Sequence, residues 1–144
     1  MNLGIYSTEI RRSSVGELFE AIAGYGFSQT VFGFSSAGED PMPEQIDAEL
    51  LAFIHGQATA ADLEIVAVGG TYNMSHPDPA VRAEGAKRLE VIAGACQSLD
   101  CHFITLCTGT RTRESMWRWH DDNLTPVAWH DMLVSMERAL DIAE

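Results

Sequence analysis

Four short apolar runs alternate along the chain with four longer segments in which apolar residues recur every three or four positions. The runs lie at residues 2–8, 29–37, 63–70 and 101–110. Short apolar runs that end in hydroxyl residues or glycine are typical of buried strands. The segments between them have helical spacing, so the pattern predicts strands and helices in the order βαβαβαβα.

The first two helix starts carry different local signals. Ser14 with Glu17 three positions later forms a capping box, which predicts that the first helix opens there. Pro41 and Pro43 favour the start of a second helix that continues to about Asp62. The apolar positions expected to face the core are Val15, Leu18, Phe19 and Ile22 in the first helix, and Ile46, Leu50, Phe53 and Ile54 in the second.

The last two helices share one kind of start, an N-cap residue followed directly by proline. Asp78 and Pro79 open the third helix, and Thr125 and Pro126 open the fourth. The faces predicted to be buried are Val81, Leu89, Ile92, Cys96 and Leu99 in the third helix, and Trp129, Leu133, Met136, Leu140 and Ala143 in the fourth.

Alternating strands and helices are typical of an α/β fold with parallel strands joined by right-handed crossovers. At 144 residues, without a linker or low-complexity tract, the chain is expected to form a single domain over residues 1–144. Four such units fit either a doubly wound sheet with helices on both faces or part of a closed barrel. The hydrophobic pattern does not decide between the two.

The charge balance excludes several classes of partner. The chain has 21 acidic residues against nine Lys and Arg, a formal net charge of -12, which repels nucleic acid and anionic membrane surfaces. No stretch reaches the roughly 18 to 20 apolar residues of a membrane span, and the first twelve residues lack the basic-then-apolar order of a signal peptide. We therefore predict a cytoplasmic protein with neither a nucleic-acid nor a membrane partner.

The cysteines Cys96, Cys101 and Cys107 are odd in number and have apolar neighbours, which favours buried thiols over disulfides. His102 lies among them, but their spacing matches no zinc finger or ribbon, so no metal site is predicted in this chain.

The segment from Gly69 to Trp129 is the most specific part of the sequence. It contains GGTYNM at the end of the third strand, HPDP at a helix entry and LCTGTR at the end of the fourth strand. This order resembles the sugar phosphate isomerase/epimerase family of xylose-isomerase-like (β/α)8 TIM barrels. The loop MWRWHDDN and the helix TPVAWHDML are also similar to that family.

The resemblance implies a barrel of eight βα units, of which this chain supplies four, the N-terminal half. It also implies metal-assisted proton transfer on a sugar or sugar phosphate in carbohydrate metabolism. The family's divalent metal, Mn, Mg or Zn, is held mainly by residues of the later strands, which these four units do not include. The chain is therefore expected to be inactive alone, as half of a longer enzyme or as a non-catalytic half-barrel that self-associates, a homodimer through open sheet edges.

In such a barrel the loops after the strands form the active-site rim. Polar residues of these loops that could hold a sugar or a phosphate are predicted to bind substrate: Tyr6, Tyr72, Asn73, Thr108, Thr110 and Arg111. His76 is the candidate general acid or base. The alternatives are that Asn73 is a turn residue, that His76 packs at the helix entry, and that Arg111 pairs with an acid.

Two further features of these loops have two interpretations each. Five of the nine basic residues lie in the first and fourth loops, where they could bind a phosphate or pair with surface acids: Arg11, Arg12, Arg111, Arg113 and Arg118. Trp117 and Trp119 could close over a substrate or cover the end of the barrel or a subunit contact.

Overall fold

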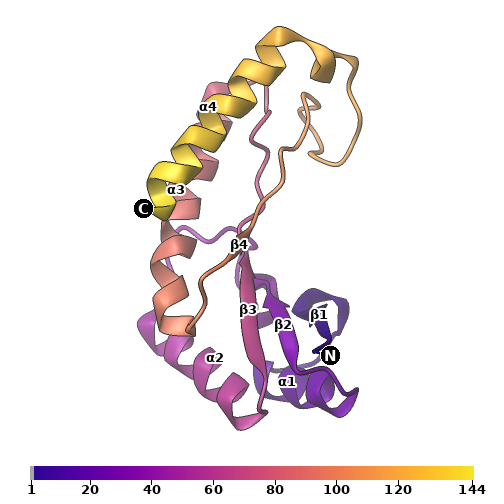
Figure 1. Cartoon of the computed structure of the whole chain (residues 1–144), viewed down its shortest axis with the longest axis vertical. Helices are drawn as coiled ribbons and strands as arrows, with labels where there is room; N and C mark the ends of the chain where they lie inside the picture. The colour runs from indigo at the N-terminus through magenta and orange to yellow at the C-terminus, as the bar shows by residue number, and fades with distance from the viewer. Residues whose placement is uncertain (1) are drawn as a thin grey trace.

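In the computed structural model, which describes residues 2–144, four parallel strands form one sheet in the order β1-β2-β3-β4 (Figure 1). The strands are β1 (Gly4–Tyr6), β2 (Gln29–Phe32), β3 (Glu64–Gly69) and β4 (Ile104–Thr105). The α-helices are α1 (Val15–Gly24), α2 (Ala48–Ala60), α3 (Pro79–Cys96) and α4 (Pro126–Ala143). The predicted alternation is therefore confirmed.

The sequential strand order decides between the two arrangements left open above. Every crossover moves one strand in the same direction, and right-handed crossovers in one direction place all the helices on one side of the sheet. In keeping with this, α1 packs on α2, and α3 packs on α4. A doubly wound sheet would reverse its strand order at a switch point, and this sheet does not. The chain thus has the arrangement of half a barrel.

Aromatic rings form the centre of the core beneath β2. Phe19 of α1, Phe32 of β2 and Phe34 are fully buried. Their rings meet edge to face, with centroids 5.9 Å apart for Phe19 and Phe32 and 5.6 Å apart for Phe32 and Phe34. Edge-to-face pairs add to the stabilisation from burial alone.

The start of α2 differs from the prediction. Its N-cap is Asp47, whose carboxylate accepts the N–H of Glu49 at 2.9 Å, and the helix begins at Ala48 rather than near Pro43. The proline segment is instead an irregular loop that buries Met42 in the core. On α2 itself Leu51 is buried, whereas Phe53, predicted to be buried, is 49% exposed.

The strands are shorter than the apolar runs that predicted them. β2 ends at Phe32 because the chain turns at Gly33 into a 3-10 helix, η2 (Phe34–Ala37). β4 keeps only two residues of the predicted 101–110, and it pairs with β3 alone. An edge strand has hydrogen-bonding partners on one side only, so its ends are less constrained.

The surface of α4 is the largest departure from the prediction. The apolar stripe is exposed rather than buried, at 62% for Trp129, 39% for Leu133, 38% for Met136 and 62% for Leu140. The buried positions are instead the small residues Ala128, Ser135 and Ala139. On α3, likewise, Val81 is 44% exposed. The reason is that α4 packs on α3 along its face of small residues, which turns its apolar stripe away from the main core.

The buried thiols predicted from the sequence are found at two of the three cysteines. All three cysteines are free thiols, with Cys96 and Cys101 buried. Burial, with a smaller effect from Cys101, raises the pKa of the Cys96 thiol to about 11. Across residues 2–144 no helix is both long enough and apolar enough to cross a bilayer.

Candidate functional site

The loops that follow the strands carry most of the polar residues predicted to bind substrate. Parallel strands bring their carboxyl ends to the same edge of the sheet, which faces the upper part of the molecule in Figure 1. Within residues 2–144 three 3-10 helices lie in these loops: η1 (Ser7–Glu9) after β1, η2 after β2, and η4 (Asp121–Leu124) before α4. Tyr6 ends β1 at this edge, and its side chain is 49% exposed.

A buried serine joins the first loop to the second. The side chain of Ser7 is fully buried, and its Oγ accepts the N–H of Gly33 at 3.0 Å. The same oxygen lies 2.8 Å from Oγ of Ser36. These contacts hold the loops after β1 and β2 in fixed positions relative to each other.

Asn73 joins the third loop to the fourth. Its Oδ1 accepts the N–H of Thr110 at 2.9 Å, and the N–H of Ser75 donates to the carbonyl of Thr108 at 2.9 Å. Gly109 between them has a φ of 70°, and a Cβ there would lie 2.0 Å from Oδ1 of Asn73, so only glycine fits. The amide of Asn73 is therefore a link between loops.

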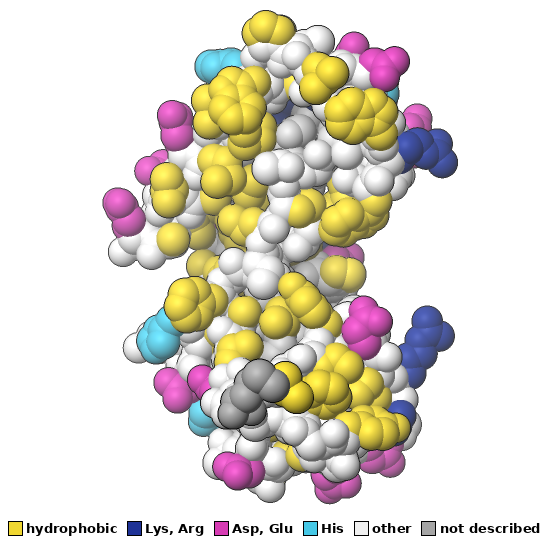
Figure 2. All heavy atoms as spheres, turned by 45° about the vertical axis from the view of Figure 1, so that its right-hand side comes forward, with side chains coloured by type: hydrophobic (Ala, Val, Ile, Leu, Met, Phe, Trp, Pro, Cys, Tyr) yellow, Lys and Arg dark blue, Asp and Glu magenta, His cyan; other side chains and the backbone are white. Residues whose placement is uncertain are grey.

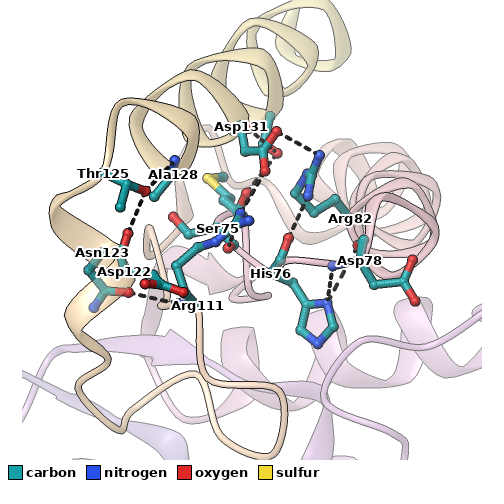
Figure 3. Close-up of polar contacts among 12 residues, drawn as sticks. Ser75, His76, Asp78, Arg82, Arg111, Asp122, Asn123, Thr125, Ala128 and Asp131 are labelled. Atoms are coloured by element: carbon teal, nitrogen blue, oxygen red, sulfur yellow. Dashed lines mark hydrogen bonds and ion pairs between the residues drawn. The ribbon is translucent and has the colours of Figure 1, made fainter.

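Arg111 takes part in a buried ion-pair network (Figure 3). One carboxylate oxygen of Asp131 on α4 lies 2.6 Å from Nη1 of Arg111, and the other lies 3.0 Å from Nη2 of Arg82 on α3. The side chains are only 12% exposed for Arg111, 14% for Arg82 and 17% for Asp131. We call these three residues the Asp131 triad.

Arg111 makes two further hydrogen bonds to loop residues. Its Nη1 also donates to the carbonyl of Ser75 at 3.1 Å, and its backbone N–H donates to Oδ1 of Asn123 at 2.7 Å. The guanidinium thus ties the third and fourth loops to α4 and does not point into open solvent. The partner is Asp131, not one of the nearby loop acids, and nothing in the local sequence indicated it.

His76 lies at the entry to α3 and is 7% exposed. Its Nδ1 accepts the N–H of Asp78 at 3.1 Å, and its backbone carbonyl accepts a hydrogen bond from Arg82. Figure 3 shows the imidazole turned toward Asp78 and away from Asp131. These contacts match the helix-entry interpretation, and within residues 2–144 no hydrogen bond engages Nε2 of the ring.

Tyr72 lies in the core rather than at the rim. Its side chain is 7% exposed, and its ring covers Gly85 of α3 so closely that a Cβ there would lie 2.1 Å from Cδ2 of the ring. Within residues 2–144 its buried hydroxyl has no hydrogen-bond partner. Burial raises the pKa of this hydroxyl.

The two threonines of the fourth loop that are predicted to bind substrate have different surroundings. Thr110 is 9% exposed, and its Oγ1 accepts the N–H of Thr112 at 2.9 Å. Thr108 is exposed and borders a pocket of about 260 Å³ that Trp119 and Trp129 also line. Trp117 is 74% exposed.

A larger pocket of about 430 Å³ opens beside the first two loops. Its lining combines hydroxyl groups, two guanidiniums and two apolar side chains, from Thr8, Ile10, Arg11, Arg12, Leu18, Ser35 and Ser36. We call it the β1–β2 pocket. Its hydroxyl and guanidinium groups face one cavity, and within residues 2–144 none of them is engaged in an ion pair.

The donor groups of this half-barrel do not fit the divalent ion that the family implies. Among residues 2–144 no three His, Cys, Asp or Glu side chains gather in a set that could hold a metal. Nδ1 of His76 accepts a backbone N–H, and Asp131 is bound by two guanidiniums. We therefore assign no reaction step to a metal held by this chain.

A family profile described as "Xylose isomerase-like TIM barrel" matches residues 19–144. The chain belongs to this family. The predicted family resemblance and the predicted fold class, four βα units of a TIM barrel, are thus confirmed. No curated protein sequence matches the chain.

Solved structures similar to the chain include sugar epimerases that share its fold over about half their length. The chain matches 3-keto-D-glucoside 4-epimerase from E. coli, apo form, with a TM-score of 0.70 and 16% identity, over 99% of this chain and 52% of that one. D-psicose 3-epimerase with D-tagatose, from Clostridium cellulolyticum H10, matches with a TM-score of 0.72 and 20% identity over 99% and 48%. D-psicose 3-epimerase in the presence of D-fructose matches with a TM-score of 0.67 and 21% identity, over 99% of this chain and 50% of that one. The chain spans about half the length of these structures.

Proposed function

We propose that this chain supplies the substrate-positioning loops of a sugar isomerase/epimerase-like barrel, whose catalytic metal is held by the other half. The observation that carries the proposal is the half-barrel itself, with polar loops gathered at the carboxyl edge of its strands. Barrels of this kind use that edge for their active sites. The fold match to sugar epimerases supports a small sugar, or its phosphate, as the ligand.

The residues now proposed to contact substrate differ from the initial set. Tyr6 and Thr108 keep this role because both are exposed at the rim. Ser35 joins them through the β1–β2 pocket. Asn73, Thr110 and Arg111 instead hold the loops in place, and Tyr72 supports the strand end from the core. Among residues 2–144 no carboxylate orients the ring of His76, so we propose that this residue positions the loop.

The proposal separates sugar binding from catalysis, and an experiment can measure both. D-tagatose is added to the chain, and binding is followed by saturation-transfer NMR with D-sorbitol, which lacks the carbonyl, as the control sugar. Turnover is followed in the same samples with Mn²⁺. We expect D-tagatose to bind more strongly than D-sorbitol and to remain unconverted. Absence of D-tagatose binding would overturn the positioning role, and turnover would overturn the assignment of catalysis to the other half.

A second candidate function is a half-barrel module that pairs with a second copy of itself. The observation that favours it is an apolar groove of about 470 Å³ beside β4, between α3 and α4. Leu89, Ile104, Leu106, Met136 and Leu140 are among its lining residues. Figure 2 shows hydrophobic side chains spread from the upper part of the molecule across its narrow middle to the lower part, with charged groups mainly toward the margins.

A second copy suits this surface because both terminal strands, β1 and β4, have open edges of the same parallel sheet. A two-fold axis would pair β4 of each copy with β1 of the other and close eight strands, as in a complete barrel. Exposed apolar patches of this kind commonly mark protein contacts.

Sedimentation equilibrium tests this pairing. We expect a dimer that Leu140→Glu dissociates, because Leu140 lines the groove and is 62% exposed. Leu124→Glu is the matched control, since Leu124 is 80% exposed and does not line the groove. A monomeric wild-type chain at all concentrations, or equal dissociation by both variants, would contradict the pairing.

A further inference from the structure

The positive charges of this acidic chain are unevenly engaged. Four of its nine basic side chains form ion pairs with carboxylates, namely Arg82, Arg88, Arg111 and Arg138. Over residues 2–144 the remaining five form none: Arg11, Arg12, Lys87, Arg113 and Arg118. An anionic ligand gains most from cations whose charge no carboxylate already neutralises.

Arg11 and Arg12 have surroundings that the other free cations lack. Both line the β1–β2 pocket, and none of the residues that line this pocket is acidic. Arg113 also borders a pocket, of about 260 Å³, but Glu114 and Asp122 line it too. The β1–β2 pocket is therefore a positively charged cavity in a protein with a formal net charge of -12.

The pocket also offers neutral donors in fixed positions. Ser36 is held by the contact of its Oγ with Ser7, whose side chain is fully buried. One end of the Arg12 guanidinium is anchored, because Nη1 donates to the carbonyl of Arg11 at 2.8 Å. A guanidinium has five N–H donors, so most of those on Arg12 remain available, together with the whole guanidinium of Arg11.

We propose that the β1–β2 pocket binds the phosphate of a sugar phosphate. This inference rests on the proposed function, and it adds that a sugar carrying a phosphate binds more tightly than the same sugar without one. A phosphate ester presents three strong acceptor oxygens and close to two negative charges, which match two guanidiniums and neighbouring hydroxyls. The pocket lies at the carboxyl edge of the sheet, where a sugar bound by the rim can place its phosphate.

The test uses inorganic phosphate as the probe in an NMR titration of the ¹⁵N-labelled chain at constant ionic strength. Arg11→Gln/Arg12→Gln is compared with the control Arg113→Gln/Arg118→Gln, which removes the same charge from free arginines elsewhere. We expect wild type and control to bind phosphate equally, with shifts in residues 7–14 and 33–38, and the Arg11/Arg12 variant to bind at least about tenfold more weakly. Equal weakening in both variants, or shifts located elsewhere, would overturn the proposal.

A second titration with D-tagatose separates this inference from the proposed function. If D-tagatose binds while phosphate does not, the phosphate pocket is refuted and the sugar-positioning role remains. If phosphate binds at Arg11 and Arg12 while D-tagatose does not bind, the pocket stands and the role for neutral sugars fails. The Arg11/Arg12 variant is expected to fold, because both side chains are exposed and neither packs in the core. Its amide spectrum verifies this.

Discussion

The Asp131 triad makes a quantitative prediction about stability. Asp131→Asn keeps the size of the side chain but leaves the guanidiniums of Arg82 and Arg111 facing each other without a carboxylate. Each Arg–Asp contact contributes roughly 4 kcal/mol of attraction at an effective dielectric of about 20. Repulsion between the guanidiniums and the cost of desolvation offset much of this attraction.

Removing one partner of a buried ion pair costs about 3 to 5 kcal/mol. Because the three side chains are 12% to 17% exposed, we expect the lower end, about 3 kcal/mol. For 144 residues the entropy of unfolding is about 0.3 kcal/mol per kelvin, so Tm should fall by about 10 °C. Thermal unfolding followed by circular dichroism measures this change.

Glu90→Gln is the matched control for this variant. It neutralises an acid in the Arg138–Glu90 pair, whose side chains are 50% and 47% exposed, and exposed pairs contribute less than about 1 kcal/mol. Adding Arg111→Met to Asp131→Asn should recover at least about 1 kcal/mol by removing one of the two unpaired charges. If Asp131→Asn lowers Tm no more than Glu90→Gln does, the triad is refuted as a source of stability.

Three further predictions concern the core. Gly85→Ala should cost about 1 to 3 kcal/mol because its Cβ would collide with the ring of Tyr72, whereas Gly94→Ala on the same helix, with open space around it, should stabilise by about 0.5 kcal/mol; urea unfolding compares them. Tyr72→Phe should raise the free energy of unfolding by about 1 kcal/mol, because it removes a buried hydroxyl that has no partner within residues 2–144, and a loss of similar size would show that this hydroxyl is satisfied. The pKa of Cys96 is about 11 in the folded chain, against about 9 in the unfolded chain, so the unfolded chain loses the thiol proton first as the pH rises. The folded state therefore keeps its full stability below pH 9 and loses about 2 kcal/mol of it by pH 11. Urea unfolding at pH 8 and pH 10.5 should show a smaller loss in Cys96→Ala, and equal losses would contradict this pKa.

The sequence predicted those features of the fold whose cause lies within a few residues. At the helix starts, the side chains of Ser14, Asp78 and Thr125 each accept a hydrogen bond from a backbone N–H two or three residues later, and all three bonds form. The predicted start of α2 was wrong because two prolines gave a stronger local signal than Asp47, which is the actual N-cap.

The candidate site was less predictable because its contacts join distant parts of the chain. Arg111 looked available for substrate, but its partner Asp131 is reached only when α4 packs on α3. Tyr72 follows a strand as a rim residue would, yet its ring turns inward because Gly85 leaves space on α3. The exposure of the apolar stripe on α4 could not be predicted from the sequence. Helical periodicity shows that a face is apolar, but it does not show whether another element covers that face.

The most direct test of the central claim is to locate D-tagatose on the half-barrel by amide chemical shifts. The account predicts changes at the carboxyl edge, in residues 7–14, 33–38 and 106–113. The opposite edge, residues 25–28, 61–63 and 100–103, serves as the internal control and should not change. Shifts confined to that opposite edge would contradict the claim that this chain positions a sugar with the loops after its strands.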